Sequence, residues 1–329
     1  MTYFDAGRVT RRMLLALPAA VLALAPLQAQ AKWPDKPVKI VLPFGPGGVA
    51  DVTARILADR LEKKLGQRFV IENMPGPGGI NAVRAVTASV PDGYTLGLVT
   101  NATAISVASF NKLPFDPVKD FDMISGLGEF NLLLAVDANS KYKTLKDFID
   151  DAKASPGKLN IGSIVVGSTQ DLGAELFKSS ANLNVQIVTF KNSPDVVVAL
   201  LRNDIQMVVD FPPALKGQIS AGKLRALAST GPHREPDMKD VPTVAESGIA
   251  GFEVTSWNGV FAPKGTPKEV IDTMGKAMQE ILVSDDVKAQ FLKVGAEAHA
   301  SSPKELMDRT IADIKKWNAV IDKAGIPRK

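Results

Sequence analysis

Hydrophobic positions in the first part of the chain alternate between two spacings. Short runs rich in Val, Ile and Leu at residues 38–42, 69–72 and 94–99 predict β-strands. Between the first two runs, apolar residues at helical spacing predict a helix, with Asp51 as a typical N-cap and Gly66 as a typical C-cap. A further helix ends near residue 88. Strands that alternate with helices predict an α/β fold with a largely parallel sheet.

The same alternation continues in a second region and in a C-terminal part. Further strands are predicted at residues 132–136, 159–162, 185–190, 205–209, 224–229 and 254–262. Helices are predicted at residues 144–155, 168–181, 195–202, 213–221, 268–283, 285–294 and 303–323. The chain therefore forms two α/β halves, with terminal helices that return to the first half. It crosses between the halves near residues 131 and 255.

The first 31 residues have the layout of a signal peptide. Arg11 and Arg12 precede an apolar run that extends to about residue 27, and a small-x-small site follows at residues 29–31. A membrane anchor would need about 20 uninterrupted apolar residues, whereas Pro18 and Pro26 interrupt this run. We expect cleavage near Ala31 and export to the periplasm. The paired arginines leave twin-arginine and general secretory export both open.

The chain length indicates two packed domains. At roughly 100–200 residues per domain, a chain of 329 residues is expected to contain two domains and a cleft between them. The expected division is a signal peptide at residues 1–31, a first lobe formed by residues 32–131 and 256–329, and a second lobe formed by residues 132–255.

Composition excludes several classes of function. The chain has no cysteine and only two histidines, His233 and His299. Disulfides, a cysteine nucleophile and cysteine-based metal sites are therefore excluded, and we expect no cofactor. The formal net charge is +4, which falls to +2 when the signal peptide (three Arg, one Asp) is removed. This balance does not favour binding to nucleic acid.

Two loops of small residues follow predicted strands and precede predicted helices, at residues 43–48 and 163–167. Such loops present free backbone N–H groups and the positive end of a helix dipole, so they can bind an anion. Neither loop has the Lys-Ser/Thr of a phosphate-binding loop or the glycine spacing of a dinucleotide fold. The alternative is that both loops are ordinary turns and caps.

A series of short motifs runs in order through the mature chain. The N-terminal motifs are Trp33-Pro34, residues 43–48 with Asp51 and Arg55, Glu72-Asn73, residues 75–79 and residues 91–94. The later motifs are residues 113–117, 156–159, Gly167-Ser168, residues 225–228, residues 241–243, Trp257 and residues 265–267. Together these motifs resemble the Bug family, the periplasmic substrate-binding receptors of tripartite tricarboxylate transporters.

This resemblance implies a two-lobed periplasmic-binding-protein fold (Venus flytrap) with two crossovers and no catalytic activity. It implies a monomer that captures a small carboxylate and delivers it to two membrane transporter subunits. Main-chain amides and hydroxyl groups of the two facing loops would hold the ligand. Carried onto this sequence, the ligand-binding residues are Gly47, Gly48, Val49, Asp51, Thr103, Ser163, Gly167, Ser168, Thr169 and Asp210.

Other interpretations remain open for individual residues and for the whole chain. Asp51 and Ser168 are also good helix caps. A hydrolase could use Asp51 and Ser168, but neither histidine lies in these loops and no G-x-S-x-G motif is present. A binding protein that reports to a sensor partner would have the same sequence features as a transport receptor.

Two departures from the family pattern bear on the ligand. Residues 164–166 are Ile-Val-Val where the family has small residues, and Asp171 stands where histidine is common. If the Asp171 side chain points at the ligand, its charge penalises a highly charged anion. We therefore expect an aliphatic or aromatic mono- or dicarboxylate in preference to citrate.

Overall fold

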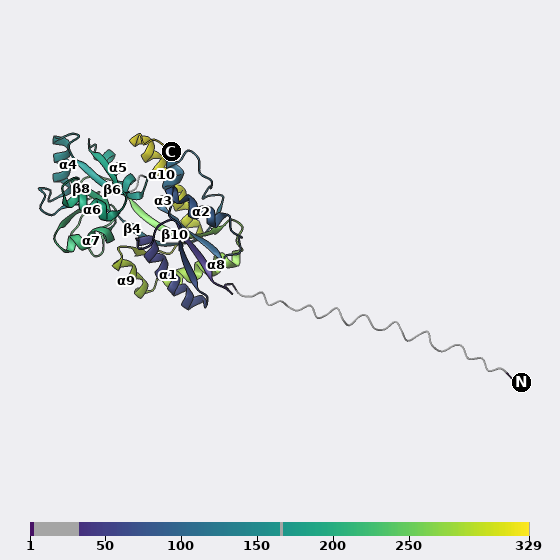
Figure 1. The fold of residues 1–329 in the computed structure, drawn as a ribbon. Coiled ribbons are helices and arrows are strands. Elements are labelled where there is room, and N and C mark those ends of the chain that lie inside the picture. The colour runs from purple at the N-terminus through teal and green to yellow at the C-terminus, as the bar shows by residue number, and fades with distance from the viewer. Residues whose placement is uncertain (3–32, 165–166, 329) are drawn as a thin grey trace.

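The computed structural model describes residues 1–2, 33–164 and 167–328, and shows two β-sheets with helices on both faces (Figure 1). The predicted cleavage site near Ala31 and most of the predicted signal peptide lie outside the described residues. So do Val165 and Val166. Among the described residues, none of the helices combines the length and the apolar character needed to span a bilayer.

The first sheet contains six strands. Their order is β11 (Glu297–Ala298), β4 (Phe121–Asn131), β10 (Thr255–Pro263), β3 (Thr95–Thr100), β1 (Val38–Leu42) and β2 (Phe69–Asn73). Strand β1 pairs in parallel with β2 and β3, whereas β10 is antiparallel to β3 and β4. The short β11 is antiparallel to β4.

The second sheet contains five strands. Their order is β7 (Gln186–Phe190), β6 (Asn160–Ile164), β8 (Met207–Asp210), β5 (Leu133–Asp137) and β9 (Leu224–Ser229). Strand β6 is parallel to β7 and β8, and β5 is antiparallel to β8 and β9. Both sheets are mixed, so the expectation of a largely parallel sheet is wrong. Strands β5 and β10 each begin where the chain arrives from the other sheet, so no crossover helix precedes them within their own sheet. Both strands pair antiparallel with their neighbours.

Helices flank both sheets, and all of them except α3 lie close to ranges that the hydrophobic pattern predicts. Those associated with the first sheet are α1 (Val49–Leu65), α2 (Ile80–Thr87), α3 (Asn101–Ser109), α8 (Lys268–Leu282), α9 (Asp285–Lys293) and α10 (Pro303–Ala324), with a 3-10 turn at Pro77–Gly79. Those associated with the second sheet are α4 (Leu145–Ala154), α5 (Thr169–Ser180), α6 (Ser193–Leu201) and α7 (Pro212–Ser220).

The chain passes between the sheets twice. It leaves the first sheet at Asn131, where β4 ends, and enters the second at Leu133. It returns between Ser229 and Thr255. Strand β4 and helix α3 are absent from our sequence-based assignment. In β4, small residues including Gly126 and Gly128 interrupt the hydrophobic alternation that identifies a strand.

The C-terminal helix α10 connects the two halves a third time. It packs against α3 and β4, and also against α5 beside the second sheet. One buried apolar cluster includes Ala104 of α3, Leu172 of α5, Trp317 of α10 and Leu134 of β5. The return of the terminal helices to the first half is as predicted, but α10 also contributes to the core of the second half.

Candidate functional site

The two predicted anion-binding loops end in the same backbone conformation. Gly47 has a φ of 88° and Gly167 a φ of 82°, in the left-handed region that favours glycine. The following residues are the N-caps, with φ and ψ of −78° and 170° at Gly48 and −77° and 167° at Ser168. Helix α1 starts after the first cap and α5 after the second. The two halves therefore present an equivalent pair of glycine and N-cap between β1 and α1 and between β6 and α5.

Asp51 holds the first loop in this shape. Its Oδ2 accepts hydrogen bonds from Gly47 N (2.9 Å) and Arg55 Nε (3.0 Å), and its Oδ1 accepts one from Asn73 Nδ2 (2.9 Å). Burial alone would raise the pKa of Asp51, but the hydrogen bonds from Arg55, Gly47 and Asn73 lower it overall. The predicted N-cap role is wrong, because Gly48 is the cap and Asp51 lies in the first turn.

Asp171 has the same role in the second loop. Its Oδ2 accepts a hydrogen bond from Gly167 N (2.8 Å), and its Oδ1 accepts one from Ser163 Oγ (3.2 Å). Glycine therefore precedes aspartate by four residues in both loops, which is the sequence signal for this shared geometry. The Asp171 carboxylate is turned onto its own loop, so the expectation that it repels the ligand loses its main support.

The N-termini of α1 and α5 carry N–H groups without intrahelical acceptors. The intrahelical bonds begin with Val52 N to Gly48 O (2.9 Å) and Leu172 N to Ser168 O (3.0 Å). The amides of Val49, Thr169 and Gln170 precede these bonds and resemble the donors that bind anions in other proteins. As predicted, Ser168 caps its helix. Its Oγ accepts from Asp171 N (3.1 Å) and donates to Ile164 O (2.5 Å).

Asn101, at the start of α3, links the two halves. Its side chain is fully buried, and its Nδ2 donates to Thr169 Oγ1 of α5 over 3.1 Å. Its Oδ1 accepts from Trp317 Nε1 of α10 over 2.7 Å. The N-terminus of α3 thus lies against that of α5, so the carboxyl edges of β3 and β6 face each other. Our sequence analysis missed Asn101, although its position two residues after a predicted strand is a recognisable signal.

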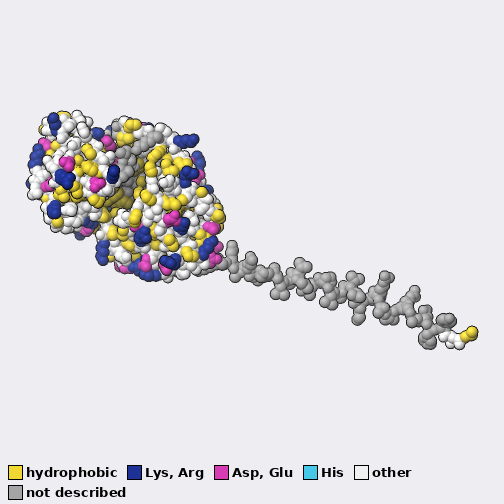
Figure 2. Space-filling view, in the orientation of Figure 1, with side chains coloured by type: hydrophobic (Ala, Val, Ile, Leu, Met, Phe, Trp, Pro, Cys, Tyr) yellow, Lys and Arg dark blue, Asp and Glu magenta, His cyan; other side chains and the backbone are white. Residues whose placement is uncertain are grey.

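The space-filling view shows a hollow between the part that carries α4 to α7 and the part that carries α1 and α9 (Figure 2). Yellow hydrophobic side chains line part of its wall.

The other predicted ligand residues lie deeper in the protein. Thr103 is 4% exposed, and its Oγ1 accepts a hydrogen bond from Thr100 N at the start of α3. Ser163 is fully buried and belongs to β6, so its assignment to the loop is wrong. Asp210 ends β8 and accepts a hydrogen bond from Gln170 Nε2 of α5 (3.1 Å). The structure therefore brings Asp210 close to the second loop, whereas Thr103 is the third residue of a capping box whose N-cap is Thr100.

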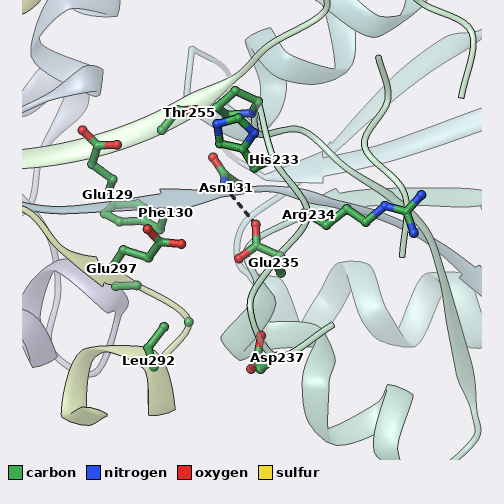
Figure 3. A pocket seen from close by; sticks show the side chains of 13 residues that line it. Glu129, Phe130, Asn131, His233, Arg234, Glu235, Asp237, Thr255, Leu292 and Glu297 are labelled. Atoms are coloured by element: carbon green, nitrogen blue, oxygen red, sulfur yellow. Dashed lines mark hydrogen bonds between the residues drawn. The ribbon is translucent and has the colours of Figure 1, made fainter. Parts of the chain in front are cut away.

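A separate cavity lies where the chain crosses between the sheets (Figure 3). We call it the hinge cavity; its volume is about 130 Å³. Four of its lining residues are acidic: Glu129, Glu235, Asp237 and Glu297. Glu235 is 7% exposed, and its Oε1 accepts a hydrogen bond from Asn131 Nδ2 (2.9 Å). The acidic side chains in this lining would repel a bound carboxylate, so the hinge cavity is not the predicted anion-binding site.

Burial raises the pKa of Glu235, and the nearby Glu297 and Asp237 charges raise it further. An acid with a raised folded-state pKa contributes most to stability at low pH, and this contribution is lost as the pH rises through that pKa. Glu235→Gln keeps the acceptor for Asn131 but cannot ionise. We expect its Tm to exceed that of the wild type by a margin that grows from pH 5 to pH 8. Thermal unfolding scans at several pH values measure this difference in Tm, and a difference that stays constant with pH would contradict the prediction. The control is Glu62→Gln, because the Glu62 side chain is exposed.

In the part of the chain that the structure describes, no group of three or more His, Asp or Glu side chains could hold a metal ion.

Comparison with known proteins gives a consistent result. Residues 53–326 match the model of the tripartite tricarboxylate transporter family receptor. The protein BugT of Bordetella pertussis is 31% identical over 96% of this chain and 98% of its own length.

Three solved structures are also similar along nearly their whole length. Rpa4515 of R. palustris with adipate has a TM-score of 0.81 and 33% identity, covering 90% of this chain and 99% of its own. MatC from Rhodopseudomonas palustris with bound malate has a TM-score of 0.76 and 30% identity, covering 88% and 99%. The periplasmic binding protein BugD has a TM-score of 0.78 and 28% identity, covering 90% and 100%.

Proposed function

This chain belongs to the tripartite tricarboxylate transporter receptor family, and we propose that it binds a small carboxylate between its two equivalent loops. The observation that carries the proposal is the pair of left-handed glycines, Gly47 and Gly167, each of which precedes a helix N-terminus with free N–H groups. Rpa4515 with adipate and MatC with malate are relatives of similar fold. The ligand class proposed here is therefore an aliphatic dicarboxylate.

In this proposal the first lobe contains residues 32–131 and 256–329, and the second contains residues 132–255. The two sheets support this division. The contacting groups in the first lobe are Gly47, Gly48 and Val49, with Asp51 shaping the loop. Those in the second lobe are Gly167, Ser168 and Thr169, with Asp210 behind them. Because the Ser168 hydroxyl donates to Ile164 O, its backbone N–H is the better ligand donor.

The proposal extends to location and partners. The solved relative BugD is a periplasmic binding protein, and Arg11, Arg12 and the small-x-small site at residues 29–31 support export of this chain. A monomer that starts near Lys32 would deliver its ligand to two membrane subunits. N-terminal sequencing of the exported protein tests the cleavage site, and co-purification with the membrane subunits tests the partnership.

The binding test uses two glycines of the same loop. Gly45→Ala and Gly47→Ala both add a Cβ where no atom lies within 4 Å, but only Gly47 has a positive φ, of 88°. The added strain at Gly47 is about 1–2 kcal/mol, so we expect its affinity for the bound dicarboxylate to fall about tenfold. Gly45→Ala should bind like the wild type.

Isothermal titration calorimetry with adipate, malate and succinate measures these affinities. The absence of binding by the wild-type protein to all three acids would overturn the proposed ligand class. Equal affinities of the two alanine variants would instead show that the first loop does not contact the ligand.

A further inference from the structure

Asp210 occupies an unusual position for a carboxyl group. Its side chain lies at the carboxyl end of β8, beside the first turn of α5, and is 1% exposed. Its Oδ1 accepts hydrogen bonds from Gln170 Nε2 (3.1 Å) and Phe211 N (2.7 Å). Its Oδ2 is also buried but accepts no well-formed hydrogen bond in the described part of the chain, although the Ser193 side chain lies nearby.

A buried carboxylate normally has a cationic partner or several donors at each oxygen. The ion pairs among the described residues include both Asp51 and Asp237, with Arg55 and Lys216 respectively, but not Asp210. An ionised Asp210 would therefore have one charged oxygen in a buried position without a well-formed hydrogen bond. A protonated Asp210 would leave only a neutral hydroxyl there, at a much lower cost in desolvation.

The charged groups on the surrounding elements do not compensate for this burial. Asp171 of α5 is turned to Gly167 N and Ser163. Lys191, which precedes α6, and Asp195, in the first turn of α6, are exposed. Lys216 of α7 pairs with Asp237. Burial raises the pKa of Asp210, and the contacts from Ser193, Gln170 and Phe211 N that lower it are too weak to offset burial.

We propose that Asp210 is an uncharged carboxylic acid in the folded protein at neutral pH, and that its lack of charge allows a carboxylate to bind at the adjacent N-terminus of α5. The second half of this proposal rests on the function proposed above. Asp210 acts as a positioning residue, because it holds the side chain of Gln170, whose backbone N–H belongs to the anion-binding turn. An ionised Asp210 at the same place would repel the ligand.

The charge state can be measured without any ligand. In protein labelled with ¹³C at the aspartate carboxyl carbons, through-bond NMR assigns the Asp210 resonance, and its loss in Asp210→Asn verifies the assignment. At pH 7 we expect the Asp210 carboxyl carbon to have the chemical shift of a neutral acid. The carboxyl carbon of Asp51, the matched aspartate with an arginine partner, should have the chemical shift of an ionised carboxylate. An ionised Asp210 at pH 7 would overturn the proposal, even if the asparagine variant does not fold.

Calorimetry with adipate, or with malate if adipate does not bind, tests the consequence for the ligand. Because Asp210→Asn imitates the neutral acid, we expect it to show no gain in affinity over the wild type that increases from pH 6 to pH 8. Removal of an ionised group next to a bound anion would instead raise affinity tenfold or more, which would contradict the proposal. If neither acid binds, the proposed function fails, while the NMR result still decides the charge of Asp210.

Discussion

Asp51→Ala is expected to weaken ligand binding more than tenfold and to destabilise the first half of the protein. The carboxylate is 2% exposed and accepts hydrogen bonds from Gly47 N, Arg55 Nε and Asn73 Nδ2. A hydrogen bond to a charged group contributes about 1.5–3 kcal/mol. Because Arg55 can return to solvent, we expect a total loss of about 3 kcal/mol in the free energy of unfolding. The glycine loop loses its anchor at Gly47, so affinity should fall more than tenfold.

Urea denaturation and calorimetry measure the two effects. The hydrogen bonds lower the pKa of Asp51 in the folded protein. Its contribution to stability is therefore fully present above the unfolded-state pKa and is lost as the pH falls through the folded-state pKa. The difference between wild type and variant should shrink in acid. Asp59→Ala is the matched control on the same helix, since this exposed side chain forms surface ion pairs with Lys63 and Arg60, which contribute little to stability. Equal losses in both variants would refute the proposed role of Asp51.

Trp317→Ala is expected to lower stability by about 3–5 kcal/mol, the usual cost of removing a large buried aromatic side chain. Trp317 is 1% exposed and belongs to the apolar cluster that contains both Ala104 of α3 and Leu172 of α5. Its indole N–H also donates to Asn101, which in turn donates to Thr169. The change therefore loosens the contact of α10 with both halves.

Trp317→Phe separates packing from hydrogen bonding. It retains most of the apolar surface but leaves Asn101 Oδ1 without its donor, so we expect a loss of about 1–2 kcal/mol. Both variants should also weaken carboxylate binding, because Asn101 no longer fixes Thr169. A Trp317→Ala protein as stable as the wild type in urea would show that α10 does not connect the halves.

Much of the fold follows from local sequence alone. Strand β9 and helix α4 with its Thr144 cap lie where the hydrophobic pattern predicts them, because periodicity and capping act over a few residues. The positions of the two glycine loops can also be predicted from the sequence, since the positive φ at Gly47 and Gly167 favours glycine over other residues. The motifs along the whole mature chain identified the family, which the comparisons confirm.

Tertiary structure alone decided how the polar side chains of the two loops are used. Asp51 and Asp171 turn onto Gly47 and Gly167, a choice that depends on backbone positions set by both sheets. Asn101 meets Thr169 across 68 residues of sequence, and no local pattern encodes such a contact. The surroundings of Asp210 depend in the same way on three separate segments, because burial and the lack of a charged partner are properties of the packed interior rather than of the sequence around a residue.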